Sequence, residues 1–184
     1  MNTINILILI STVLFLLVLW AIVGVRHLKY LKNGVKEQWE LIDERLRKRH
    51  DLIPNLIETV RVYIQDQEVL LEKLIIDRTN AAREYSPNLK KIENEHELIL
   101  MVKQVVDLGV GCAGLPTGQA GLAKDTNFLE LIKEIEDIGK DVELKVGKYN
   151  EMVRYYNRHR NMILLMPVAV VFKFGVMNIF EVEA

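Results

Sequence analysis

The densest group of side chains that could do chemistry contains Asp43, Arg49, Asp51 and Asn55, with Arg78 further along the chain. Asp51 and Asn55 are one helical turn apart and therefore share a face. Arg49 and Arg78 fall at positions where helical spacing predicts buried residues. An unpaired buried charge costs several kcal/mol, so each guanidinium needs a counter-ion. We expect Asp43 and Asp51 to supply it.

This group has two interpretations. In the first, it is a structural polar network that fixes helix register, completed by two asparagines of the last predicted helix. Its members are then Asp43, Arg49, Asp51, Asn55, Arg78, Asn150 and Asn157. In the second, Asp43, Arg49, Asp51, Asn55 and Arg78 form the catalytic or ligand site of a membrane-bound enzyme or accessory subunit. No nucleophile–base pair accompanies the group, which favours the structural network and a protein that is not an enzyme.

Other candidate motifs are weak. The spacing Gly109-x-Gly111-x-x-Gly114 matches a dinucleotide fingerprint, but the run before it has helical periodicity rather than the required strand. The histidines (His27, His50, His96 and His159) lie in separate segments without helical metal-site spacing. Cys112 has no basic pair or histidine beside it. We therefore predict no catalytic residue, no cofactor and no metal.

Residues 1–25 contain no charged side chain, and Ile4 to Val25 is apolar except for Asn5, Ser11 and Thr12. A helix of about 20 residues crosses a hydrocarbon core of about 30 Å. Basic residues follow this run rather than precede it, unlike in a signal peptide. We expect residues 4–25 to contact membrane lipid as an uncleaved single-pass anchor. The positive-inside rule then predicts an external N-terminus and a cytoplasmic domain at the cell (inner) membrane.

Residues 26–184 read as one all-α domain. Heptad spacing in the first helix predicts a buried stripe of Val35, Trp39, Ile42, Leu46, Ile53, Leu56 and Val60, with Arg49 at its one charged step. The phase survives Pro54, which we expect to kink this helix. A break there, with Asp51 capping a new helix, is the alternative.

Three further helices are predicted. The second covers about 68–85, with Leu71, Leu74, Ala81 and Tyr85 inward, and a Ser86-Pro87-Asn88 turn follows it. The third covers about 90–108, with Ile92, Ile99, Val102 and Val106 on one face. The last begins at an N-cap at Asp125 or Thr126 and ends near Leu165. Its stripe is Phe128, Leu131, Ile135, Ile138, Val142, Val146, Tyr149, Val153, Tyr156 and Ile163.

Helix lengths suggest an antiparallel, up-and-down bundle of two long and two short helices after the anchor. A glycine-rich loop at 107–125 separates the last two helices. The tail at 166–184 is apolar, but Pro167 and Lys173 interrupt it, so we do not expect it to span the membrane. We expect it to pack on the bundle or lie at the membrane interface, with Lys173 reaching outward.

Residues 39–63, WELIDERLRKRHDLIPNLIETVRVY, resemble the signature of the LemA family. Supporting matches are LLEKLIIDRTNAA at 70–82, NFLELIKEIED at 127–137, KYNEMVRYYN at 148–157 and the terminal M-P…FGVMNIFE. The resemblance implies one N-terminal anchor, a helical bundle at 26–184 and no established catalytic activity. At 107–125 the glycine-rich stretch replaces a Tyr-Pro-x-Leu-Lys-like segment common in the family, so inferences about that face do not transfer.

Composition narrows the partners. The chain has 24 basic and 25 acidic residues, so no basic excess points to nucleic acid. The lone cysteine excludes an intrachain disulfide framework. The predicted anchor, the helical faces and the resemblance to the LemA family together lead us to expect a scaffold or adaptor of the bacterial envelope that binds another envelope protein and also self-associates.

Overall fold

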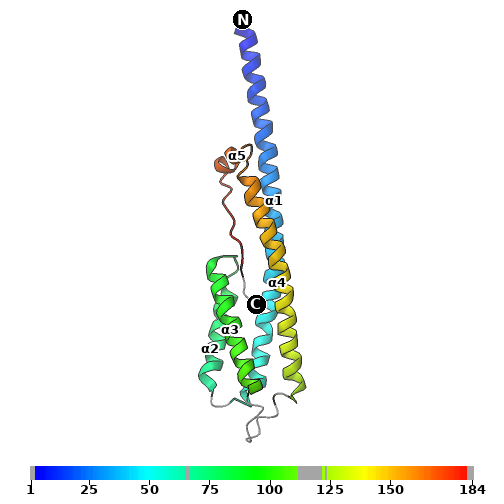
Figure 1. Cartoon of the computed structure of the whole chain (residues 1–184). Helices are drawn as coiled ribbons and strands as arrows, with labels where there is room; N and C mark the ends of the chain where they lie inside the picture. The colour runs from blue at the N-terminus through cyan, green and yellow to red at the C-terminus, as the bar shows by residue number, and fades with distance from the viewer. Residues whose placement is uncertain (1–2, 65–66, 112–121, 123, 182–184) are drawn as a thin grey trace. The chain divides into compact units, whose positions relative to one another are not determined.

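The structure is a computed structural model that describes residues 3–64, 67–111, 122 and 124–181. Figure 1 shows its helices, which are α1 (Thr3–Arg61), α2 (Glu68–Arg83), α3 (Leu89–Gly111), α4 (Thr126–Arg160) and α5 (Met166–Val171). No strand occurs in these described ranges, so the all-α fold class is confirmed. The chain packs as two compact units. Unit 1 contains residues 1–37 and 150–178, and unit 2 contains residues 38–149 and 179–184.

Helix α1 begins with the uncharged run. It contains an 18-residue window of mean hydropathy 3.1, none of which is buried, so this helix is long and apolar enough to cross a membrane. The predicted stripe from Val35 to Val60 is buried at every position, and Arg49 is 5% exposed. The helix continues through Pro54 to Arg61, as expected, and the alternative break is wrong.

The starts of α3 and α4 follow from their capping residues. The Asn88 side-chain oxygen accepts a hydrogen bond from the Lys91 amide at 2.7 Å. Asp125 Oδ1 accepts from the amides of Asn127 and Phe128 at 2.9 and 3.2 Å. These bonds satisfy amides that have no partner inside the first turn of a helix. The predicted turn before α3 and the N-cap at Asp125 are therefore confirmed.

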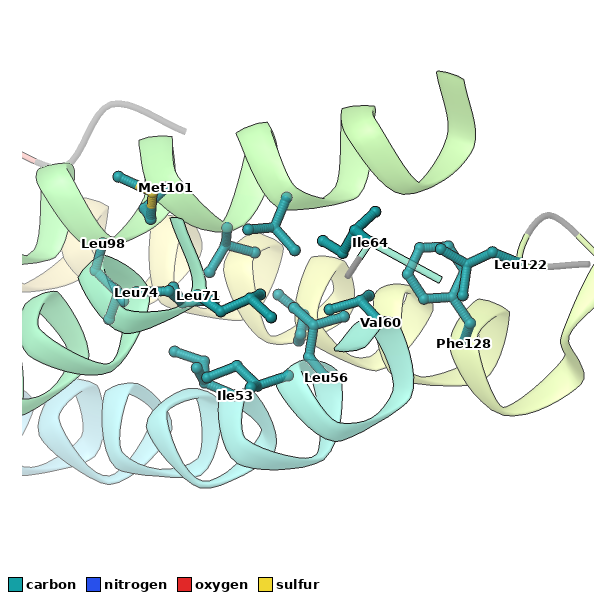
Figure 2. Packing of buried hydrophobic residues seen from close by; sticks show 14 of the residues in the cluster. Ile53, Leu56, Val60, Ile64, Leu71, Leu74, Leu98, Met101, Leu122 and Phe128 are labelled. Carbon is teal, nitrogen blue, oxygen red and sulfur yellow. The ribbon is translucent and has the colours of Figure 1, made fainter. Parts of the chain in front are cut away.

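The core of unit 2 joins residues from α1, α2, α3 and α4. Figure 2 shows Ile53, Leu56 and Val60 of α1 pointing into the cluster that contains Leu71 and Leu74 of α2. All five are at most 2% exposed. Burying a large aliphatic side chain contributes about 1.5–3 kcal/mol, so this cluster is a main source of stability in unit 2.

Trp39 closes a second part of unit 2. Its indole Nε1 donates to the Tyr85 carbonyl at 2.8 Å, in the connection between α2 and α3. Its ring meets that of Phe180 edge-on, with centroids 4.9 Å apart. The tryptophan thus combines a buried apolar ring with a satisfied polar edge.

In unit 1, α5 approaches α1 closely at Gly24. A Cβ atom there would lie 3.1 Å from Val168 Cγ2 and 3.3 Å from Leu165 Cδ2. At Gly34 a Cβ would lie 2.7 Å from Met152 Cε of α4. These glycines permit the close packing of their helix against its neighbours within the unit.

After α5 the chain turns through a backbone cap and then continues as an extended tail. Lys173 has a φ of 55°, and the Lys173 and Phe174 amides donate to the Val170 and Ala169 carbonyls at 3.3 and 2.9 Å, which is a Schellman cap. Three α4 side chains then bind the tail. Tyr156 donates to the Gly175 carbonyl at 3.0 Å, and Arg160 donates to that of Phe174 at 2.7 Å. Asn157 donates to the Met177 carbonyl at 2.8 Å and accepts from its amide at 3.1 Å.

Three helical predictions need correction. Helix α4 ends at Arg160 rather than near Leu165, and Ile163, 90% exposed, follows it in a turn. The rest of the predicted α4 stripe is buried except for Leu131, which is half-buried. Helix α2 ends at Arg83, so Tyr85 is 63% exposed, and Asp77 takes the inward position assigned to Arg78. In α3, Val102 of the predicted face is buried, whereas Ile92, Ile99 and Val106 are half-buried.

The glycine-rich segment is shorter than expected at its beginning, because α3 continues to Gly111. Gly109 and Gly111 are therefore helical, which contradicts a nucleotide-binding loop opening at Gly109. Cys112 and Gly114 lie outside the described residues. The up-and-down arrangement of the bundle stays a prediction.

The bonds between Asn157 and Met177 generate a first prediction. Asn157→Ala removes a donor and an acceptor, each worth about 1 kcal/mol, so the Met177 amide should exchange with solvent roughly tenfold or more faster. Hydrogen exchange of the full chain, followed by mass spectrometry, measures this rate. Arg158→Ala, at the exposed neighbouring position, should leave it unchanged. Equal exchange in both variants would show that the side chain does not hold the tail.

Candidate functional site: a buried ionic cluster

The site of unit 2 is built around the carboxylate of Glu95 on α3. Arg49 of α1 donates through Nη2 to Oε2 at 2.6 Å. His50 Nε2 lies 3.0 Å from Oε1 and 3.2 Å from Oε2. Lys91, one turn before Glu95, places Nζ 2.9 Å from Oε1 and also donates to the Ala81 carbonyl of α2 at 2.8 Å. One carboxylate therefore joins α1 to α3, and Lys91 extends the cluster to α2.

All four side chains of this cluster are closed to solvent. Glu95 is fully buried, and Lys91, His50 and Arg49 are 1%, 3% and 5% exposed. Burial works to raise the pKa of Glu95, but the hydrogen bond from His50 and the charges of His50, Arg49 and Lys91 outweigh it and lower the pKa to about 2. A carboxylate this acidic is a poor general base near neutral pH. Its chemistry is that of an ion-pair centre.

Two nitrogens of the cluster have no hydrogen-bond acceptor or donor within the described part of the chain. They are Arg49 Nε and His50 Nδ1, and both are buried. A buried polar atom without a partner costs about 1–3 kcal/mol, so such atoms are uncommon in folded proteins. The carboxylate of the cluster therefore has several partners, whereas Arg49 and His50 each keep one buried nitrogen without a partner among the described residues.

Arg78 has a different role from the one predicted. Proline lacks an amide hydrogen, so Pro54 cannot donate to the carbonyl four residues earlier, which belongs to His50. Arg78 Nε donates to that carbonyl at 2.7 Å. The guanidinium of α2 thus satisfies the backbone group that Pro54 leaves open inside α1. Its Nη2 also lies 3.8 Å from Asp51 Oδ1, at the surface.

The acidic residues proposed as counter-ions of Arg49 do not pair with it. Asp43 is buried but binds Arg47, one turn later, through Oδ2 at 2.6 and 2.8 Å from Nη2 and Nε. The Asp51 side chain is 76% exposed, and Asn55 is exposed. The expectation that Asp43 and Asp51 neutralise the buried guanidinium is therefore wrong, because Glu95 of α3 does so.

The two asparagines of α4 belong to unit 1. Asn157 binds the Met177 backbone, as described above, and Asn150 is 9% exposed. Neither belongs to the unit that contains Glu95. Of the seven predicted network residues, the structure brings Arg49 into the buried cluster, places Arg78 against its backbone, and distributes the others elsewhere.

Sequence reasoning missed Lys91 and Glu95, although a signal was present. Residues 91, 95, 98, 102 and 105 are separated by alternating steps of four and three, and all are buried. The predicted α3 face contains Ile92 and Ile99 instead, which are only half-buried. Extending the stripe back from Leu98 would have placed two charges on it, the same pattern that identified Arg49.

Asp77, on α2, is a further buried acid. It is 7% exposed, and its Oδ2 has no hydrogen-bond partner within the described ranges. Burial raises its pKa, Lys73 lowers it and Glu97 raises it again, with a net upward shift. Nowhere in the described residues do three or more His, Cys, Asp or Glu side chains gather as a metal site would require.

These features define an all-helical protein in which a proline-containing α1 is tied to α2 and α3 by an ionic core. The model of the LemA family matches residues 38–184, and the chain belongs to the LemA family, as the resemblance predicted. The match begins at the first residue of unit 2 and leaves residues 1–37 outside it. A comparison with curated proteins finds no match.

The role assigned to Arg78 can be tested by a double-mutant cycle with Pro54. Arg78→Met should destabilise the protein by about 1–2 kcal/mol, because the His50 carbonyl loses its donor. In a Pro54→Ala background the new amide hydrogen can reach that carbonyl, so the same substitution should cost about 1 kcal/mol less. Urea unfolding of the four proteins gives the coupling energy. Additive effects would mean that the guanidinium does not compensate for the proline.

The Glu95 carboxylate should stabilise the fold, and Glu95→Gln should lower the free energy of unfolding at pH 7 by about 3–5 kcal/mol, because two buried cations lose their counter-ion. Glu97→Gln, at an exposed position of the same helix, is the matched control and should change little.

The stability has a defined pH dependence. The pKa of Glu95 is about 2 in the folded chain and near 4.5 in the unfolded chain, so its contribution is present above about pH 4.5 and is lost as the pH falls toward 2. The wild-type curve should therefore fall more steeply over this range than that of Glu95→Gln. Parallel curves would contradict the lowered pKa.

Proposed function

We propose that this LemA-family chain is a single-pass membrane protein of the bacterial cell envelope that acts as a scaffold or adaptor and has no catalytic activity of its own. The observation that carries the proposal is the uncharged first part of α1. Its side chains are exposed at every described position from Ile4 to Trp20, including Leu7, Leu14 and Phe15 at 62–66%. An apolar surface this long is costly in water and favourable in a bilayer.

The surroundings of α5 support the same assignment. This helix packs at Gly24, near the end of the uncharged run, and the apolar side chains around it point to solvent. Ile163, Leu164, Val171 and Phe172 are 52–90% exposed, and Lys173 follows. Such a segment fits the membrane interface, with its apolar side chains among the acyl chains and its lysine near the headgroups.

Orientation follows from charge. Five basic or histidine residues between Arg26 and Lys36 come directly after the apolar run, and the first acid is Glu37. By the positive-inside rule, these basic residues lie on the cytoplasmic side of the inner membrane. Unit 2 would then be cytoplasmic.

The scaffold role is supported by the character of unit 2. Its centre of ionisable groups is a closed ion-pair cluster around a fully buried carboxylate, which suits cohesion better than turnover. Its helices also expose large apolar side chains, among them Val69 at 81% and Ile76 at 58% on one face of α2. Exposed apolar side chains at seven-residue spacing on a helix are typical of a protein-binding face.

Two measurements on the full chain in intact cells test this proposal. In a Cys112→Ser background, Thr3→Cys should react with a membrane-impermeant maleimide in spheroplasts, whereas Lys148→Cys should react only after lysis. A photoreactive amino acid at Val69 or Ile76 should give a discrete protein adduct. The same amino acid at Lys148, an exposed charged position of α4, is the control and should give none.

Labelling of Lys148→Cys in sealed spheroplasts would overturn the orientation, and recovery of the protein in the soluble fraction would overturn the anchor. Identical adduct patterns at Val69, Ile76 and Lys148 would overturn the adaptor surface.

A further inference from the structure

A cavity of about 470 Å³ lies between α3 and α4 in unit 2, and it has no role in the function proposed above. Its walls are mainly aliphatic, from Leu98, Ile99 and Val102 of α3 and from Ile132 and Ile135 of α4. We call it the α3–α4 groove. Its volume falls within the range of small-molecule sites, about 300–1,000 Å³, and such sites are also mostly apolar with a few polar groups.

Arg49 also lines the groove, and it is the buried one among the charged residues that do so. Arg49 is 5% exposed. Its Nη2 donates a hydrogen bond to Glu95, and its Nε has no acceptor among the described residues. A nine-tenths buried guanidinium with an unsatisfied nitrogen favours an anion beside it, because guanidinium groups donate N–H hydrogen bonds to carboxylates.

The charge balance of the cluster points the same way. Among the described residues, Arg49, His50 and Lys91 each place a nitrogen within 3.0 Å of one carboxylate, that of Glu95. Buried ions need compensation, and a cluster with more cations than anions gains from a further negative charge. Acidic and basic residues at the groove entrance (Lys103, Asp107, Glu136, Lys140 and Glu143) are exposed, so water screens them more than it screens Arg49.

We propose that the α3–α4 groove binds one long-chain carboxylate, a fatty acid, with its acid group at Arg49 and its chain along the aliphatic walls. A volume of 470 Å³ holds about 16 groups of the size of a water molecule or a methylene, at about 30 Å³ each, which accommodates most of one 16-carbon fatty acid. A phospholipid with two chains exceeds this volume. The site stands independently of the anchor and of the adaptor surface.

The chain offers a matched pair of glycines to test this site. Gly139 lines the groove, and a Cβ atom there would meet nothing within 4 Å, so Gly139→Leu fills the groove without a clash at its Cβ. Gly147, two turns further along α4, also has nothing within 4 Å but does not line the groove. Gly147→Leu is therefore the control for the change in helix propensity and surface hydrophobicity.

The full chain is reconstituted in nanodiscs of phosphatidylcholine and labelled with a palmitate analogue that carries a diazirine in its chain. Crosslinked peptides, identified by mass spectrometry, should come from α3 and from α4 around Gly139. Labelling of these peptides should fall at least about tenfold in Gly139→Leu and stay within twofold in Gly147→Leu. Circular dichroism and urea unfolding of both variants confirm that they are folded.

Competition with unlabelled lipids shows whether the site requires a carboxylate and whether it takes a free fatty acid or a membrane phospholipid. Unlabelled palmitate should displace the probe, whereas hexadecanol, with the same chain and no charge, should be at least about tenfold weaker because it lacks the ion pair. A two-chain phosphatidylglycerol should not compete. This arrangement separates the site from general partition into the bilayer, which hexadecanol and palmitate share.

Several results would overturn the proposal. Equal labelling in Gly139→Leu and the wild type places the probe elsewhere. Equal competition by hexadecanol shows an apolar groove without an anion site, and equal competition by phosphatidylglycerol shows a membrane-lipid site. Crosslinks between two copies at the groove, lost in Gly139→Leu without fatty acid labelling, would make a second chain the occupant.

Discussion

Unit 2 depends on one carboxylate, that of Glu95, which holds three nitrogens from two helices within 3.2 Å. Burying this ion is unfavourable alone, and its neighbours reverse the balance and lower its pKa to about 2. An interaction of this kind adds specificity, because any shift in helix register would leave at least one buried charge without a partner. The aliphatic cluster of α1 to α4 tolerates small displacements more easily, since dispersion contacts have no direction.

His50 connects this ionic centre to Pro54, which lies one helical turn later in the signature. Its ring contacts Glu95 on α3, and its carbonyl, released by Pro54, accepts from Arg78 on α2. The ring and the carbonyl of His50 thus help to fix the positions of α3 and α2. This gives a physical reason for the Arg-His pair and the Leu-Ile-Pro-Asn-Leu block of the LemA-like segment. The proline leaves one carbonyl without a donor inside a continuous helix, and the guanidinium of α2 donates a hydrogen bond to it.

The sequence predicted the helices well and the contacts between them poorly. Periodicity located the buried stripes of α1 and α4, and the N-cap of α4 is Asp125, one of the two residues predicted for it. It also identified Arg49 as a buried charge. It could not identify the partner of Arg49, because Asp43 and Asp51 are near in sequence and Glu95 is near only after α3 has folded against α1. The α3 face was missed for a related reason, since buried Lys91 and Glu95 look like surface residues in composition.

The hydrogen bonds that attach the extended tail in unit 1 affect which tail positions can change during evolution. Tyr156, Asn157 and Arg160 bind the carbonyls and one amide of residues 174–177, and none of these bonds uses a tail side chain. Backbone atoms are the same whatever residue carries them. Substitutions at exposed tail positions such as Val176 therefore leave these bonds intact, and such positions are free to diverge between relatives while the path of the chain stays constant.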